Sequence, residues 1–148
     1  MSFDYSLNFN LLNLKEDPYL YRVGKGEQGV LLVEPYKSEI LPYWRFKTPE
    51  IARESSRKIF KLFLQYKKEK DFIGMDMTRK FLQMGFTRSR RYANHASGKK
   101  YDVDGNVRPR EENEEKAISA EIFYKVWQKV EQDREYVEMR KEWKMWYG

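Results

Sequence analysis

The stretch Thr48–Gly85, TPEIARESSRKIFKLFLQYKKEKDFIGMDMTRKFLQMG, predicts two consecutive helices. Thr48 can cap the first helix, Pro49 suits its first turn, and apolar residues then recur at a helical spacing. Asp71 can cap the second helix, and Gly85 is the residue type that most often follows a helix in the left-handed conformation. We therefore expect a helical pair over residues 48–85.

The residues before this pair have the pattern of short strands. Tyr19–Val23 (YLYRV) and Gly29–Val33 (GVLLV) are rich in β-type residues and flank the glycine-rich sequence GKGEQ. Near the N-terminus, apolar and polar residues alternate with a period of two, which is typical of a half-buried strand. The alternating apolar residues are Phe3, Tyr5, Leu7, Phe9 and Leu11. We predict a strand or hairpin region over residues 1–47.

The residues after the pair divide into a loop and further helices. Residues 86–110 are predicted as a basic loop region, and residues 111–148 as C-terminal helices. The glutamates from Glu111 onward favour a helix that runs to about Gln132, and Asp133 precedes a last helix. The fold class that follows is α+β, mostly helical: N-terminal short strands or a hairpin packed on about four α-helices. The length of 148 residues indicates a single domain over residues 1–148.

The basic charge is concentrated in one part of the chain. The net charge is +6, yet residues 77–100 carry seven basic residues and no acid. Within this region, Phe86–Tyr101 (FTRSRRYANHASGKKY) also holds the only histidine. Charge concentrated in this way attracts an anionic partner more strongly than the same charge spread evenly.

The composition excludes several classes of protein. A chain that is 41% hydrophobic and 16% aromatic is too apolar to be intrinsically disordered. The absence of cysteine excludes disulfides and thiolate metal sites. No signal peptide is visible, and no apolar run reaches the roughly 18 residues needed to cross a membrane. We expect a cytoplasmic location, no membrane partner, no metal site and no cofactor.

The main functional hypothesis is nucleic-acid binding through the phosphate backbone, by a small basic accessory protein. Arginine forks onto phosphate oxygens, and tyrosine can stack on unpaired bases. A row of basic residues on the first helix would lengthen the same surface. The candidate residues are Arg88, Arg90, Arg91, Tyr92, His95, Lys99, Lys100, Arg53, Arg57 and Lys61. The structural alternative is that the arginines pair with the acidic third helix and stabilise the fold.

Two other functions remain open. The protein could dock on another protein through its two-signed surface and its aromatic C-terminus, where Trp146 lies, although the helical spacing there favours packing in the core. It could also be an enzyme or a binder for a phosphorylated small molecule, with His95 moving a proton and the Gly24–Gly29 loop closing. That loop matches G-x-G-x-x-G, but a strand is predicted after it, so a hairpin turn is favoured.

Three motifs resemble a known family. They are YRVGKGEQGVLLVEPYKSEILPYWRFKTPEIARES from Tyr21, FIGMDMTRKFLQMGFTRSRRYANHASGKKYD from Phe72, and AEIFYKVWQ from Ala120. The chain is similar along nearly its whole length to domain of unknown function 4385, a family of short cytoplasmic proteins in bacteria and tailed phages. The resemblance implies a single intracellular domain. It implies no particular activity, substrate or catalytic residue.

Overall fold

The described part of the chain is built from helices. The computed structural model describes residues 2–94, 104–105 and 113–148. Within these ranges there are five α-helices and two short 3-10 helices, and there is no β-strand. The α-helices are α1 (Tyr36–Ile40), α2 (Pro49–Lys68), α3 (Phe72–Asn94), α4 (Glu114–Glu131) and α5 (Arg134–Tyr147). The 3-10 helices are η1 (Pro18–Leu20) and η2 (Leu41–Tyr43).

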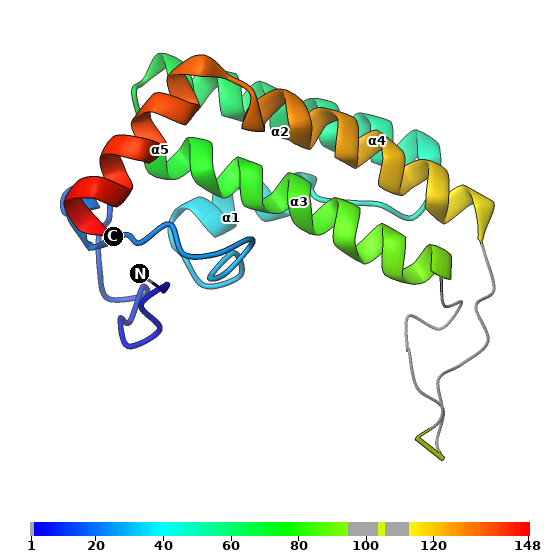
Figure 1. The fold of residues 1–148 in the computed structure, drawn as a ribbon, viewed down its shortest axis with the longest axis horizontal. Helices are drawn as coiled ribbons and strands as arrows, with labels where there is room; N and C mark the ends of the chain where they lie inside the picture. Colours follow the sequence, from blue (N-terminus) through cyan, green and yellow to red (C-terminus); the bar gives the residue numbers. More distant parts are fainter. Residues whose placement is uncertain (1, 95–103, 106–112) are drawn as a thin grey trace.

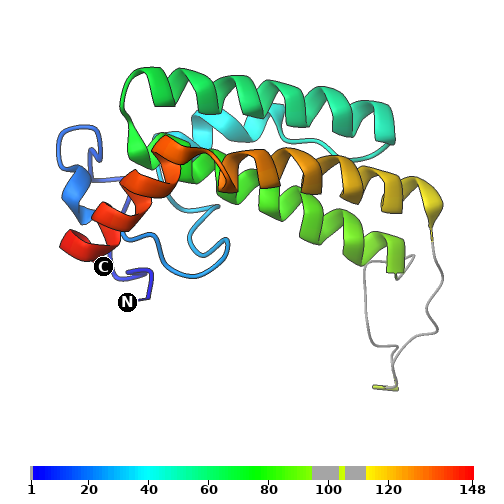
Figure 2. The same ribbon diagram turned by 45° about the horizontal axis from the view of Figure 1, so that its top comes forward.

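The three long helices α2, α3 and α4 form a bundle (Figures 1 and 2). α2 and α4 run in the same direction, and α3 runs opposite to both. Two contacts define this arrangement: Asn113 N, just before α4, donates to Ala93 O near the end of α3, and Lys67 Nζ near the end of α2 lies 2.7 Å from Asp133 just after α4. Helix α5 then turns down over the N-terminal segment (Figure 1).

Side-chain caps fix where the helices begin, as the sequence predicted for three of them. Thr48 Oγ1 accepts from Ile51 N at the start of α2, and Asp71 Oδ1 accepts from Gly74 N at the start of α3. Asp133 Oδ1 accepts from Tyr136 N at the start of α5. These caps satisfy amide groups that the first turn of a helix leaves without an intrahelical partner. The predictions of helix starts after Thr48, Asp71 and Asp133 are confirmed.

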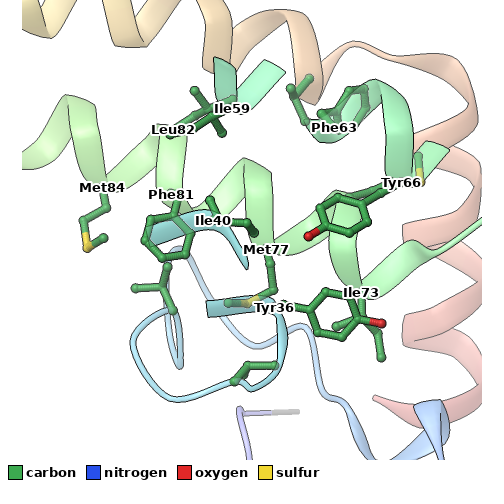
Figure 3. Close-up of a cluster of buried hydrophobic side chains, with 14 of the residues drawn as sticks. Tyr36, Ile40, Ile59, Phe63, Tyr66, Ile73, Met77, Phe81, Leu82 and Met84 are labelled. Carbon is green, nitrogen blue, oxygen red and sulfur yellow. The ribbon is translucent and has the colours of Figure 1, made fainter. Parts of the chain in front are cut away.

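Helix α3 is the central element of the core. Every residue from Phe72 to Leu82 is buried, so this half of the helix is covered on all sides. Figure 3 shows how α1 and α2 contribute to the cover: Tyr36 and Ile40 of α1 and Ile59, Phe63 and Tyr66 of α2 surround α3 side chains such as Met77 and Phe81. No described helix is both long enough and apolar enough to span a bilayer.

The α+β prediction is wrong, because the N-terminal residues form turns rather than strands. Tyr21 and Val33 are buried, but their segments are not paired with each other through a ladder of backbone hydrogen bonds. The segment after Gly29 is instead closed by local bonds, such as Val30 N to Glu27 O and Leu32 N to Gly29 O. The buried apolar residues of this region, such as Tyr21 and Val33, belong to the same core cluster as the residues of α3. Because hydrogen bonds within the turns satisfy these backbone groups, the segment does not need strand pairing to do so.

The prediction that the second helix ends at Gly85 is also wrong. α3 continues to Asn94, so residues 86–94 are helical and not part of a loop. Gly85 lies against the ring of Phe123 on α4, and a Cβ at this position would overlap that ring. The glycine therefore allows two helices to approach closely, which is the other common reason for a glycine in a helical sequence.

Candidate functional site

A fully buried group of charged residues lies on one side of α3. Asp76 and Lys80 have 0% exposure and Arg79 has 3%. Arg79 Nη2 is 2.8 Å from Asp76 Oδ1, and Lys80 Nζ is 3.8 Å from Asp76 Oδ2. Buried charges are stable only when they are paired and hydrogen-bonded, so these three side chains depend on the hydrogen-bond partners around them.

Two tyrosines from distant parts of the chain complete the coordination of Asp76. Tyr21 Oη donates to Oδ2 at 2.5 Å, and Tyr136 Oη of α5 donates to Oδ1 at 2.6 Å. Arg79 Nε donates in turn to Tyr136 Oη at 2.9 Å. One carboxylate thus joins the N-terminal segment, α3 and α5.

The two buried cations hold the Gly24–Gly29 loop against α3. Arg79 Nη1 donates to the carbonyl of Gly26, and Lys80 Nζ donates to the carbonyl of Gln28 at 2.7 Å. Lys80 Nζ also lies 5.0 Å from the ring centre of Tyr21. Two backbone carbonyls are fixed by side chains of α3, so the loop has a structural attachment that the sequence motif did not reveal.

The pKa values of the buried group follow from these contacts. Burial raises the pKa of the Asp76 carboxyl, but the charges of Arg79 and Lys80 and the two tyrosine hydrogen bonds outweigh it and lower the pKa to about 2. Burial lowers the pKa of the Lys80 ammonium to about 8, against the opposing effect of Asp76. Burial, reinforced by Asp76, raises the pKa of Tyr21 well above its usual range. The carboxylate of Asp76 and the guanidinium of Arg79 are therefore charged at neutral pH although both are buried.

A groove of about 560 Å³ lies between α2 and α4 and is lined by none of the residues of the buried cluster. Its floor includes Phe60 of α2 and Ile118, Ile122 and Val126 of α4. The two helices run side by side in the same direction, so the groove follows their length (Figures 1 and 2).

The rims of the groove carry cations on both sides. Arg53 and Arg57 line it from α2, and Lys125 and Lys129 line it from α4, with Glu121 as the one acid among its lining residues. Each pair is separated by four residues, so its side chains lie on one face of their helix. Among the residues that the structure describes, none of these four cations takes part in an ion pair. These cations and the apolar floor between them are together called the α2–α4 groove.

The sequence prediction found half of these cations. Arg53 and Arg57 were predicted as binding residues and line the groove, while Lys61 is exposed one turn further along α2 but does not line it. Lys125 and Lys129 were missed. Their spacing of four on a predicted helix was the available signal, and the acidic start of that helix obscured it.

The predicted arginine cluster lies on the last turns of α3 and not in the α2–α4 groove. Arg88 and Arg91 act on Glu27 of the N-terminal segment, where they oppose the rise in its pKa that burial causes. Tyr92 is half-buried, and its ring centre lies 6.1 Å from that of Phe46. Arg90 is half-buried on the same turns of the helix. His95, Lys99 and Lys100 lie outside the described residues.

The C-terminal aromatic residues divide between core and surface. Trp143 packs in the core region, with its ring centre 4.9 Å from that of Phe72 and its Nε1 donating to Tyr21 O at 2.9 Å. Trp146 is 69% exposed and Met145 is 74% exposed. The prediction of core packing is therefore confirmed for Trp143 and wrong for Trp146.

Fold and site together define a protein whose described residues form helices and turns. A buried ionic cluster fixes its N-terminal segment, and two parallel helices form a groove with cationic rims. The chain belongs to the family described as Domain of unknown function (DUF4385), whose model matches residues 4–146. Searches of curated proteins and of solved structures each found no match. Function has to be argued from the residues themselves.

Proposed function

We propose that this protein is a binding module whose α2–α4 groove captures an anionic macromolecule. The observation that carries the proposal is that two cation pairs, Arg53 with Arg57 on α2 and Lys125 with Lys129 on α4, line one groove together with apolar side chains. Cations without ion-pair partners within the described structure keep their field available for an incoming anion. An apolar floor between them adds area that a bound partner can bury.

The proposal is tested by binding of labelled polyanions to the purified protein at low and high salt. The probes are an acidic peptide, single-stranded DNA and RNA, and the readout is fluorescence anisotropy. Arg57→Glu and Lys125→Glu should each weaken binding, and both should reduce its dependence on salt. Lys141→Glu, on the exposed side of α5, is the matched control for net charge. Absence of binding at low salt, or equal binding by all variants, would overturn the proposal.

Nucleic acid is a second candidate, supported by the exposed row Arg53, Arg57 and Lys61 along α2. A row of this kind can follow a phosphate backbone, which supplies most sequence-independent affinity. If nucleic acid binds along this row, Lys61→Glu should weaken binding and lower the salt dependence, and Lys125→Glu should have little effect. Arg91→Glu tests in the same assay whether the end of α3 extends the surface.

An enzymatic role has less support. It requires the Gly24–Gly29 loop to close over a substrate, but Arg79 and Lys80 hold two of its carbonyls to α3. His95, the proton carrier in that hypothesis, lies outside the described residues.

A further inference from the structure

We propose that the partner of the α2–α4 groove is an acidic amphipathic helix of another protein. The inference rests on the proposed function, because it names the kind of anion that the groove accepts. Three features of the groove fit an acidic amphipathic helix: the chemistry of the floor, the placement of the cations and the length.

The floor suits aliphatic side chains better than nucleobases. Three of its four apolar lining residues, Ile118, Ile122 and Val126, are aliphatic and offer no flat ring on which a base could stack. The one aromatic residue, Phe60, is already occupied: its ring stacks with that of Phe63 at 5.8 Å between centres, and Lys129 Nζ lies 5.9 Å above it. Leucine-type side chains of a helix can fill such a floor without any stacking surface.

The rims match the charge pattern of an amphipathic helix. Such a helix carries an apolar stripe with polar residues on both flanks. Acidic residues on one flank would meet Arg53 and Arg57 of α2 toward one end of the groove, and acidic residues on the other flank would meet Lys125 and Lys129 of α4 toward the other end. Glu121 lies level with Arg57, so the cations of α4 begin further along the groove than those of α2. The two cation pairs are therefore complementary to carboxylates on opposite flanks of a bound helix, one group toward each of its ends.

The groove has the length of a short helix. Its lining on α4 runs from Ile118 to Lys129, which at about 1.5 Å per residue corresponds to roughly 16 Å, or three turns. An occupant of three turns presents apolar anchors at positions i, i+3 or i+4, and i+7, the spacing used in other grooves that bind helices. Ile118 is 47% exposed and is available to the first of these anchors.

The test uses synthetic peptides with the wild-type protein and matched variants. One peptide has leucines at helical spacing flanked by glutamates; a second has the same composition in scrambled order; and single-stranded DNA of equal charge is the third probe. The ordered peptide should bind and become helical by circular dichroism. Lys125→Glu and Ile118→Glu should each weaken it by about tenfold, whereas Lys61→Glu and Lys141→Glu should leave it unchanged. The circular dichroism of each free variant confirms that it is folded.

The possible results test the helical partner and the capture of anions separately. If only DNA binds, or if the scrambled peptide binds as well as the ordered one, the inference of a helical partner is overturned while the capture of anions stands. If neither peptide nor DNA binds at low salt, both the inference and the proposed function fail.

Discussion

Tyr136 on α5 donates a 2.6 Å hydrogen bond to Asp76 in the middle of α3, across 60 positions of the chain. The same carboxylate accepts from Tyr21 in the N-terminal segment. The ends of the chain are therefore joined through one buried acid on the central helix. Loss of the Asp76 carboxylate should therefore loosen both the N-terminal segment around Tyr21 and helix α5 around Tyr136, although these lie far apart in the sequence.

Replacement of Asp76 by asparagine should lower the free energy of unfolding by about 3–5 kcal/mol. The substitution keeps the shape but removes the carboxylate that pairs with both Arg79 and Lys80, and Arg79 keeps Glu131, 3.8 Å from its Nε, as an acidic partner. Urea unfolding followed by circular dichroism measures the effect. Glu138→Gln, an exposed carboxyl on α5, is the control and should change stability by less than about 0.5 kcal/mol. A loss below about 1 kcal/mol for Asp76→Asn would show that the cluster does not act as a unit.

Acid should remove the contribution of Asp76 within a defined window. The pKa of the Asp76 carboxyl is about 2 in the folded protein and 3.8 in the unfolded chain, so the unfolded chain takes up the proton first as the pH falls. The contribution is complete above the unfolded value, declines as the pH falls from 3.8 to about 2, and amounts to about 2 kcal/mol. The stability difference between wild type and Asp76→Asn, measured from pH 5 to 2, should shrink over that window. A constant difference would contradict the assignment.

Lys80 should make the protein more stable as the pH rises above neutrality. Its pKa falls from 10.5 to about 8 on folding, because burial disfavours the ammonium. Between these values the unfolded chain holds the proton and the folded chain does not, so raising the pH favours folding. Lys80→Met, which keeps an unbranched apolar side chain, should abolish this rise between pH 8 and 10. Above about pH 10 the trend should reverse, since burial raises the pKa of Tyr21 and Tyr136 and the unfolded tyrosines ionise first.

Gly85→Ala should destabilise the protein by about 1–3 kcal/mol even though alanine is the better helix former. The added Cβ overlaps the ring of Phe123 and forces α3 and α4 apart. Thermal unfolding measures the loss. Phe123→Leu removes the ring, so the double variant should lose less stability than the sum of the two single variants. A stabilised Gly85→Ala protein would show that the two helices have room to move.

The sequence indicated where helices begin more reliably than where they end or what the N-terminus does. Thr48, Asp71 and Asp133 cap helices through side chains, so their signal is local. A glycine such as Gly85 can either end a helix or allow a neighbouring helix to approach closely. Only the position of the Phe123 ring shows that the second reason applies here. In the β-type run Gly29–Val33, Val30 and Val33 are buried while Leu31 and Leu32 are exposed, and propensity alone does not distinguish burial in a turn from burial in a strand.

The buried cluster could not be predicted from the usual behaviour of its residues. Lysine, arginine and aspartate are almost never fully buried, so residue type alone gives no reason to place Asp76, Arg79 and Lys80 in the core. Their partners Tyr21 and Tyr136 lie more than 50 positions away on either side. One weak signal existed: these charges interrupt an apolar run in which no face of the helix is otherwise polar.

The parallel course of α2 and α4 gives their groove a direction. The N-termini of both helices lie at the end marked by the caps Thr48 and Asn113, and both C-termini lie at the end marked by Lys67 and Asp133. Their dipoles therefore add, and the potential along the groove decreases from the first end to the second. A helix bound there is favoured with its own C-terminus at the Thr48 end. The groove would thus distinguish an acidic peptide from its reversed sequence, although both have the same composition and the same apolar stripe.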